Sequence, residues 1–396
     1  MARIALTWEL GVGSGYVATM AAIARAARAQ GHECIFMVRD LAVAAPHLGP
    51  DLGDLVQAPI GATPPHQQVK VQTSYASLLH NCGFASSTVL RARLRSWQAL
   101  YSRFAVDCVM SRHSPTAVLA ARLMQLPLLR YGQGFSEPPE QSPWPSFRPD
   151  LQIPESALLQ NEDHLLGVMN QAIGELGGKT LSAPANLVRG TPLALLTYPE
   201  LDRYPRPAGT RYLGMPEISY GAEPEWPAGN GPRLFVSLHS VRQLDQWLPL
   251  LNPLKARCLV RLFHGSASGL SKAEHIRIFD DPPINFDRAA ETADAILCYG
   301  SHNLANVGLL KGKPIGVIAN TPDQLMMGVT VQKLGMGLLM STNPDAGTPA
   351  MIERLLTDAS LRQTTMAFAE RYANWNRDTI PQRLLDAALA AQPSGF

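Results

Sequence analysis

RIALTWELGVGSGYVATMAAIARAARAQGHECIFMVRD, residues 3–40, carries the pattern that decides the fold of this chain. A short apolar run leads through a glycine-rich segment into a stretch with helical periodicity, and a second apolar run follows Gly31. Short apolar runs on either side of a helix are typical of two parallel strands joined by a helical crossover. The segment therefore predicts a right-handed strand–helix–strand unit.

The same alternation continues along the chain. A strand, a helix and a strand are predicted within residues 106–132 by VDCVMS, TAVLAARLMQ and LPLLRYG. A Pro- and Gly-rich stretch at 204–232 interrupts the pattern, which restarts with RLFVSLH at 233–239 and runs to a last helix at 381–391. The chain is therefore predicted to be an α/β protein with two doubly wound, Rossmann-like domains that face each other across a cleft.

The length agrees with two domains, since 396 residues is about two and a half times a typical domain of roughly 150 residues. We assign residues 1–210 to an N-terminal domain, 211–232 to a linker and 233–372 to a C-terminal domain. The helix within 373–396 is expected to pack back on the N-terminal domain. The Pro-rich segment 138–154 is expected to be a loop.

Composition excludes several classes of protein. With 46% hydrophobic and 17% charged residues, the chain can bury real cores and is not disordered. A formal charge of +2 without a basic run argues against nucleic acid as a partner. Short apolar runs and no typical signal segment argue against membrane insertion. Five cysteines without paired spacing indicate reduced thiols and no metal site, so we expect a cytoplasmic protein.

Three glycines follow the first predicted strand, at Gly11, Gly13 and Gly15. They allow a sharp turn, and the helix start behind them offers main-chain N–H groups to an anion or a polar ligand. Their GxGxG spacing differs from the GxGxxG dinucleotide fingerprint. A connection without a ligand is the alternative.

Two junctions in the second half have the composition of an anion site. Ser240 ends VSLHS and can offer its hydroxyl, although a plain helix N-cap explains it as well. In CYGSHNLANVGLLKGKP, residues 298–314, a strand ends and a polar triplet opens a helix, an arrangement that can hold a diphosphate without a lysine. No Walker lysine motif is present, which excludes P-loop chemistry. The candidate residues of this second junction are Tyr299, Gly300, Ser301, His302 and Asn303.

Asp323 and Gln324 follow the next predicted strand, in TPDQ. A carboxylate and an amide side by side can bind vicinal hydroxyl groups, because one accepts hydrogen bonds and the other both donates and accepts. A helix N-cap at Asp323 is the alternative.

In this order, the segments resemble those of the UDP-dependent glycosyltransferases with the GT-B architecture, particularly bacterial members that begin with a WELG-type loop. VSLHS is similar to the VSxGS phosphate loop of that family, with His239 in place of glycine. Residues 298–314 are similar to its HxGxNSxxExLxxGxP donor segment, and TPDQ to its D/E-Q sugar-binding pair. PPINFDRA, residues 282–289, takes the place of the base-binding loop, with Ile284 and Phe286 as base contacts. The resemblance covers nearly the whole chain.

The chain departs from the family at four positions. Tyr16 stands where the family often has its catalytic histidine, and Tyr299 replaces the phosphate-binding histidine. Ser301 replaces the glycine that follows, and Val307 replaces the ribose-binding glutamate. An unperturbed tyrosine is a poor base at neutral pH, so another group must deprotonate the acceptor, or the activity is altered or lost.

The resemblance implies a nucleoside diphosphate sugar, linked to UDP or dTDP, as donor in the C-terminal domain and a small hydrophobic acceptor in the N-terminal domain. It further implies one displacement with inversion, without a metal and without a cofactor besides the nucleotide sugar. A lipid-linked or peptide acceptor is the runner-up. Two other functions remain open: a catalytically degenerate partner that stabilises or activates a transferase, and a sugar-nucleotide epimerase.

Two residues are candidate bases on the acceptor side. Glu9 follows the first predicted strand, and His113 follows VDCVMS in SRHSP. We place Glu9 first, because the glycine-rich loop brings it close to where an acceptor would meet the donor. The alternatives are a solvated loop carboxylate at Glu9 and a polar loop residue at His113.

Several aromatic side chains of the N-terminal domain are candidates to line an apolar acceptor pocket, although residues at such spacing are more often core. They are Tyr75, Phe84, Trp97, Tyr131, Phe135 and Trp144.

Overall fold

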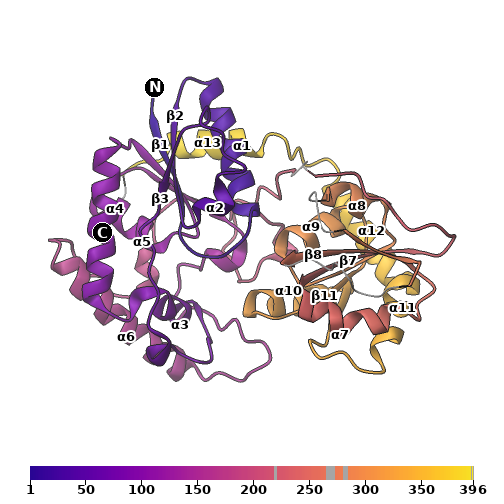
Figure 1. The fold of residues 1–396 in the computed structure, drawn as a ribbon. Coiled ribbons are helices and arrows are strands. Elements are labelled where there is room, and N and C mark those ends of the chain that lie inside the picture. The colour runs from indigo at the N-terminus through magenta and orange to yellow at the C-terminus, as the bar shows by residue number, and fades with distance from the viewer. Residues whose placement is uncertain (218–220, 265–272, 280–283, 394, 396) are drawn as a thin grey trace. The chain divides into compact units, whose positions relative to one another are not determined.

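The computed structural model divides into two compact units (Figure 1). Unit 1 comprises Met1–Pro216 together with Arg377–Phe396, and unit 2 comprises Glu217–Asn376. The division thus falls inside the segment that the sequence assigns to a linker. The structure describes residues 1–217, 221–264, 273–279, 284–393 and 395. Parts of the expected linker (218–220), C-terminal domain (265–272 and 280–283) and terminal segment (394 and 396) lie outside the described residues.

Unit 1 is built on a six-stranded parallel sheet of order β3-β2-β1-β4-β5-β6. Its strands are β1 (Arg3–Trp8), β2 (Glu33–Val38), β3 (Asp54–Gln57), β4 (Cys108–Arg112), β5 (Leu128–Gly132) and β6 (Leu193–Leu195). Its helices are α1 (Gly15–Ala29), α2 (Leu41–Ala44), α3 (Tyr75–Leu79), a π-helical turn η2 (His80–Phe84), α4 (Ser87–Arg103), α5 (Pro115–Leu123), α6 (Glu155–Gly174) and α13 (Ile380–Leu389). Short 3₁₀ turns are η1 (Pro65–Gln67), η3 (Gly134–Ser136), η4 (Pro184–Leu187) and η5 (Pro199–Leu201).

The central strands of unit 1 read as continuous apolar runs because both faces of the sheet are covered. Ile4 of β1 is paired with Cys34 of β2 and Cys108 of β4, and all three side chains are buried. The C-terminal helix α13 packs against α1, β4 and β5. The Pro-rich segment 138–154 contains no helix or strand, as predicted.

Unit 2 repeats the topology in a sheet of order β12-β11-β10-β7-β8-β9. Its strands are β7 (Arg233–Ser240), β8 (Arg257–His264), β9 (Ile276–Phe279), β10 (Ala295–Cys298), β11 (Ile315–Ile318) and β12 (Gly337–Met340). Its helices are α7 (Val241–Leu251), α8 (Phe286–Thr292), α9 (His302–Leu310), α10 (Pro322–Lys333), α11 (Thr348–Thr357) and α12 (Ala359–Tyr372).

Within each unit, the first three strands run outward in one direction and the next three in the other, which is the doubly wound order of Rossmann folds. The predicted α/β class with two doubly wound, Rossmann-like domains is confirmed. Near the end of unit 2, the helical stretch from Thr348 to Tyr372 is divided into α11 and α12. Asp358 divides it, because its carboxylate accepts hydrogen bonds from the Ser360 and Leu361 N–H groups and caps α12.

Candidate functional site

The carboxyl edge of the unit 1 sheet brings the two candidate bases into adjacent loops. Glu9 follows β1 and His113 follows β4, and these strands are neighbours in the sheet. The Leu10 N–H donates to the His113 carbonyl oxygen at 2.9 Å, which joins the two loops.

Glu9 is fully buried, and its carboxylate is fully used within unit 1. Its Oε1 accepts from the Arg93 guanidinium and, at 2.6 Å, from the Thr116 hydroxyl, while its Oε2 accepts from the Thr116 N–H at 2.9 Å. Arg93 also donates to the carbonyl oxygens of Cys82, at 2.8 Å, and Pro59, at 3.4 Å. This geometry overturns the assignment of Glu9 as a general base that meets the acceptor: the carboxylate ties the segment after β1 to helices α4 and α5 instead.

His113 has the opposite character. Its side chain is 5% exposed, and neither ring nitrogen has a hydrogen-bond partner in the described part of the chain. Burial lowers the pKa of His113 to about 3, with further lowering by the positive charges of Arg39 and Arg112. The imidazole is therefore neutral at pH 7, with one donor and one acceptor nitrogen that are both shielded from solvent and unsatisfied among the described residues.

The glycine-rich loop folds around the Tyr16 ring. Gly11 has a φ of +81°, and a Cβ atom there would overlap Tyr16, whose Cζ would be 2.8 Å away. The Tyr16 ring stacks on Trp8 with 5.2 Å between centroids, and the Arg112 guanidinium lies 4.8 Å from its centre. Tyr16 therefore packs on the loop that the sequence assigns to an acceptor, and Gly11 is required by this packing.

Two arginines that sequence analysis missed hold this loop. Arg39 donates to the Gly11 carbonyl oxygen at 3.0 Å. Arg112 donates to the carbonyl oxygens of Gly15 and Tyr16, both at 3.1 Å. Gly13, with a φ of +107°, lies between these anchors. No signal in the sequence points to them, because an arginine at a strand end is ordinarily solvated.

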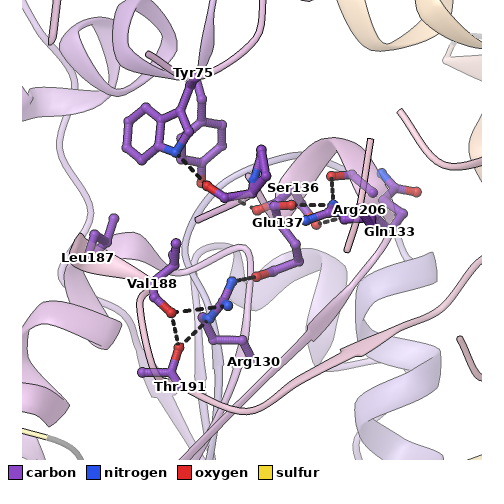
Figure 2. A network of polar contacts seen from close by, with 12 residues as sticks. Tyr75, Arg130, Gln133, Ser136, Glu137, Leu187, Val188, Thr191 and Arg206 are labelled. Atoms are coloured by element: carbon purple, nitrogen blue, oxygen red, sulfur yellow. Dashed lines mark hydrogen bonds and ion pairs between the residues drawn. The ribbon is translucent and has the colours of Figure 1, made fainter. Parts of the chain in front are cut away.

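A buried polar network fixes the loop that follows β5 (Figure 2). Arg130 pairs with the Glu137 carboxylate at 3.0 Å and donates to the Thr191 hydroxyl at 2.6 Å. Arg206 donates to the Glu137 carbonyl oxygen at 2.6 Å, and the Tyr75 hydroxyl to the Ser136 carbonyl oxygen at 3.4 Å. Burial raises the pKa of Glu137, and the two arginines oppose this shift. Beside the network lies a cavity of about 10 Å³, room for one water molecule.

The aromatic residues proposed to line an acceptor pocket lie in the core of unit 1, which is the alternative that the sequence left open. None is more than 8% exposed, so they offer little surface to a ligand. This applies to Tyr75, Phe84, Trp97, Tyr131, Phe135 and Trp144.

Exposed apolar side chains gather instead on segments that follow the first three strands. Val12, in the glycine-rich loop after β1, is 68% exposed, and Leu41, directly after β2, is 39% exposed. Ile60 and Val71, between β3 and α3, are 45% and 48% exposed. Because parallel strands end at one edge of their sheet, these segments start from the same edge as Glu9 and His113.

In unit 2, the structure brings two of the predicted donor segments together. The Tyr299 N–H donates to the Ser237 carbonyl oxygen at 3.1 Å, which sets the end of β10 beside β7. Gly300 has a φ of +79°, and a Cβ atom there would be 3.0 Å from Cβ and 3.2 Å from Cα of Gln324. The diphosphate segment and the TPDQ segment therefore approach each other closely at the carboxyl edge of the sheet.

The start of α9 has polar groups that the protein does not use. Ser301 is its N-cap residue, but its side chain makes no capping hydrogen bond. In the described part of the chain, the N–H groups of Asn303 and Leu304 and the Asn303 side chain have no hydrogen-bond partner. His302 is only 5% exposed, so its side chain packs into the unit while its main chain stays at the helix start.

Of the other predicted contacts, Ser240 is a helix cap and Asp323 is not. Ser240 caps α7 by accepting from the Gln243 N–H at 3.5 Å. This is the helix N-cap that the sequence allowed as the alternative to a phosphate contact. The N-cap of α10 is Thr321 and not Asp323, which lies half-buried in the first turn. Gln324 accepts from the Asn320 N–H at 2.8 Å through Oε1, and its amide nitrogen makes no hydrogen bond within the described residues.

The predicted base loop is only partly suited to its role. Ile284 is 2% exposed and bridges to Ala222, so it cannot present a face to a base, which corrects that assignment. Phe286 is half-buried: its ring lies 6.1 Å from that of Phe235, and the Arg261 guanidinium lies 4.7 Å from its centre. The two prolines of PPINFDRA, residues 282 and 283, lie outside the described residues.

Two kinds of feature are absent from the described residues. They contain no group of three or more His, Cys, Asp or Glu side chains arranged to hold a metal ion. None of the described helices combines the length and the apolar character that a membrane span requires.

No protein-family model and no curated protein sequence matches the chain. Solved structures do match. The glycosyltransferase SnogD from Streptomyces nogalater is 19% identical, with a TM-score of 0.66 over 97% of this chain and 99% of its own. The glycosyltransferase VinC in complex with DTDP is 14% identical, with a TM-score of 0.69 over 98% and 99%. The spinosyn rhamnosyltransferase SpnG complexed with spinosyn aglycone is 15% identical, with a TM-score of 0.69 over 98% and 100%. At such identities the likeness establishes the fold, which is the predicted GT-B architecture.

Proposed function

We propose that this protein is a glycosyltransferase that moves a sugar from a nucleoside diphosphate sugar, linked to UDP or dTDP, to a small apolar acceptor. The observation that carries the proposal is the close approach of Gly300 to Gln324 at the carboxyl edge of the unit 2 sheet. It unites a segment suited to a diphosphate with one suited to sugar hydroxyls. The fold shared with natural-product glycosyltransferases, one of them in complex with DTDP, supports this proposal.

The donor would bind through main-chain and amide groups. The Asn303 and Leu304 N–H groups at the start of α9 suit phosphate oxygens, and the helix dipole favours the charge that develops on the leaving diphosphate. In our proposal no metal ion and no cofactor besides the nucleotide sugar takes part. The Gln324 amide would donate to a sugar hydroxyl, and the neighbouring Asp323 carboxylate would accept from one.

The acceptor would bind in unit 1. Val12, Ile60 and Val71 offer exposed apolar surface on loops that start from the same sheet edge as His113. The complex of SpnG with an aglycone supports a small organic acceptor over a lipid-linked or peptide one.

Transfer would be one displacement with inversion at the anomeric carbon. The acceptor oxygen forms the new bond, the diphosphate leaves with the electron pair of the broken C–O bond, and the proton of the acceptor hydroxyl passes to the His113 imidazole late in the step. We assign the interaction with that hydroxyl to His113, because Glu9 is occupied by Arg93 and Thr116. A neutral imidazole can accept the hydrogen bond of the hydroxyl and orient it. Because its pKa is low, the His113 imidazole gives little driving force for full proton transfer before the bond between the sugar and the diphosphate breaks.

Calorimetric titration with UDP and dTDP tests the donor assignment. Binding of at least one of them with a dissociation constant below the millimolar range is expected. If neither binds, the proposal fails. Incubation of the protein with a nucleotide sugar alone separates transfer from epimerisation, since only an epimerase would change the sugar without an acceptor.

A catalytically degenerate partner protein is the second candidate. The favouring observation is that neither predicted base is ready to act: Glu9 is sealed in an ion pair, and the imidazole of His113 is buried and weakly basic. Turnover by the isolated protein, with a panel of apolar acceptors, would exclude this candidate. Nucleotide binding without turnover, together with co-purification of an active transferase, would support it.

The free thiols support a cytoplasmic site of action. All five cysteines are unpaired, and four of them are buried. Reduced cysteines are typical of proteins that work in a reducing compartment.

A further inference from the structure

The strand β7 directs one imidazole toward the proposed donor site. Alternate residues of a strand point to opposite faces of the sheet. Val236 and Leu238 belong to the apolar core on one face, so Ser237 and His239 point to the other. His239 lies at the carboxyl end of β7, one residue before the N-cap of α7, and it is half-buried.

Two aromatic residues from the neighbouring strands hold the His239 ring. The Tyr299 ring, just after β10, lies 5.7 Å from it at an interplanar angle of 81°. The Phe263 ring, in β8, lies 5.7 Å from it on an angle of 30°. Since β10 and β8 are the two neighbours of β7 in the sheet, the imidazole sits where three adjacent strands end. This packing fixes the ring plane, while the residue as a whole remains half-buried.

The main chain beneath the ring is held as well. The His239 N–H donates to the Gln243 side-chain oxygen at 2.7 Å, and the Ser240 side chain caps the same turn of α7. Its ring partner Tyr299 begins the segment that leads through Gly300 to the start of α9. The imidazole is therefore a held group beside the residues assigned to the diphosphate, and not the tip of a mobile loop.

We propose that His239 binds the diphosphate of the donor directly, with a ring N–H donating to a phosphate oxygen. This inference rests on the function proposed above. A neutral imidazole always carries one N–H, and an imidazolium adds a second donor and a positive charge, so the group suits an anion in either state. His239 would thus add a side-chain donor to a site otherwise made of main-chain N–H groups and hydroxyls.

The test compares nucleoside diphosphates with nucleosides. His239→Phe keeps an aromatic ring between Tyr299 and Phe263 but removes both ring nitrogens. Calorimetric titration would measure dissociation constants for dTDP, UDP, thymidine and uridine. We expect the substitution to weaken binding of the diphosphate by at least about tenfold and to change binding of the nucleoside less than about twofold. His275→Gln is the control. His275 directly precedes β9, so it lies where the strands begin, whereas His239 lies where they end.

The outcomes separate this inference from the function on which it rests. If the wild type binds dTDP or UDP and His239→Phe binds it equally well, His239 is not a phosphate contact, while the donor site stands. An equal loss for nucleoside and diphosphate would show a packing role and also overturn the inference. If the wild type binds neither diphosphate, the proposed function itself fails. His239→Gln, which keeps an N–H donor on a more flexible side chain of similar reach, should retain part of the affinity and serves if the phenylalanine variant does not fold.

Discussion

At the scale of single residues, the ion pair between Glu9 and Arg93 gives the buried Glu9 carboxylate a role in stability and not in catalysis. Both side chains are almost completely removed from solvent. Removing one partner of a buried pair leaves the other charge uncompensated, at a cost of about 3 to 5 kcal/mol. We expect Glu9→Gln to lower the free energy of unfolding by about this amount in a denaturant titration.

Asp51→Asn supplies the control for this prediction, because Asp51 pairs with Arg28 where both side chains are more than half exposed. It should change stability by less than about 1 kcal/mol. The outcome that contradicts our account is a Glu9→Gln protein as stable as the wild type but without turnover, since that would restore Glu9 as the catalytic base.

A second prediction at this scale concerns His113 and the change of the protein's stability with pH. The pKa of His113 is lowered from 6.5 to about 3, so between these values the folded state binds fewer protons than the unfolded state. Its contribution to stability is complete above pH 6.5 and is lost as the pH falls toward 3. His113→Asn should therefore lose stability less steeply than the wild type between pH 6.5 and 4, by up to about 1.4 kcal/mol per pH unit.

Asparagine is chosen there because the φ of residue 113 is +53°, a conformation that asparagine tolerates. Denaturant titrations at several pH values measure the difference. The exposed His66 gives the control, His66→Asn, which should keep the wild-type slope. Parallel slopes for wild type and His113→Asn would show that His113 can be protonated in the folded protein.

At the scale of elements, Gly300 couples the starts of α9 and α10. Gly300→Ala meets two costs: the positive φ, about 1 to 2 kcal/mol, and close contacts of the new methyl group with Val317 Cγ1, at 2.9 Å, and with Gln324 Cα, at 3.2 Å. Gly335→Ala meets only the first, since its nearest neighbour would be 3.8 Å away at a φ of +67°. We expect both variants to lose stability, but only Gly300→Ala to lose affinity for a nucleotide sugar in a calorimetric titration. Equal affinities in the two variants would contradict the coupling.

The elements themselves could be predicted wherever the pattern is local. RIALTW is β1, and the helical periodicity after it is α1, because an apolar run or a helical stripe is read from consecutive residues. The joining of Gly300 to Gln324 depends on strand pairing, since Gly300 follows β10 and Gln324 follows its neighbour β11.

The partners of the site residues could not be predicted, because they are remote in sequence. Arg93 lies 84 positions from Glu9, and Arg112 lies 97 positions from the Gly15 carbonyl oxygen that it binds. Whether a carboxylate is a base or an anchor depends on such a partner. The sequence therefore indicated where the strands end, and the fold decided which of the residues there remain available to a ligand.

At the scale of the whole molecule, the chain leaves unit 1 at Pro216 and returns to it at Arg377. The return is held by Arg377, which donates to the Met215 carbonyl oxygen at 2.8 Å. Helix α13 then buries Leu384 and Leu385 completely. Unit 2 is thus one continuous segment, whereas unit 1 needs both ends of the chain, a difference that should appear in how the two units respond to damage in α13.

We predict that Leu384→Ala destabilises unit 1 by about 2 to 5 kcal/mol through the cavity that it leaves, without loosening unit 2. Amide hydrogen exchange under native conditions measures this unit by unit. Protection should fall in α1, β4 and β5, against which α13 packs, and stay unchanged in β7 and β10. Leu389→Ala, in the same helix but at a side chain that is 37% exposed, should leave both units close to wild type. Equal loss of protection in both sheets would mean that the units unfold as one, and that donor binding in unit 2 depends on the C-terminal helix of unit 1.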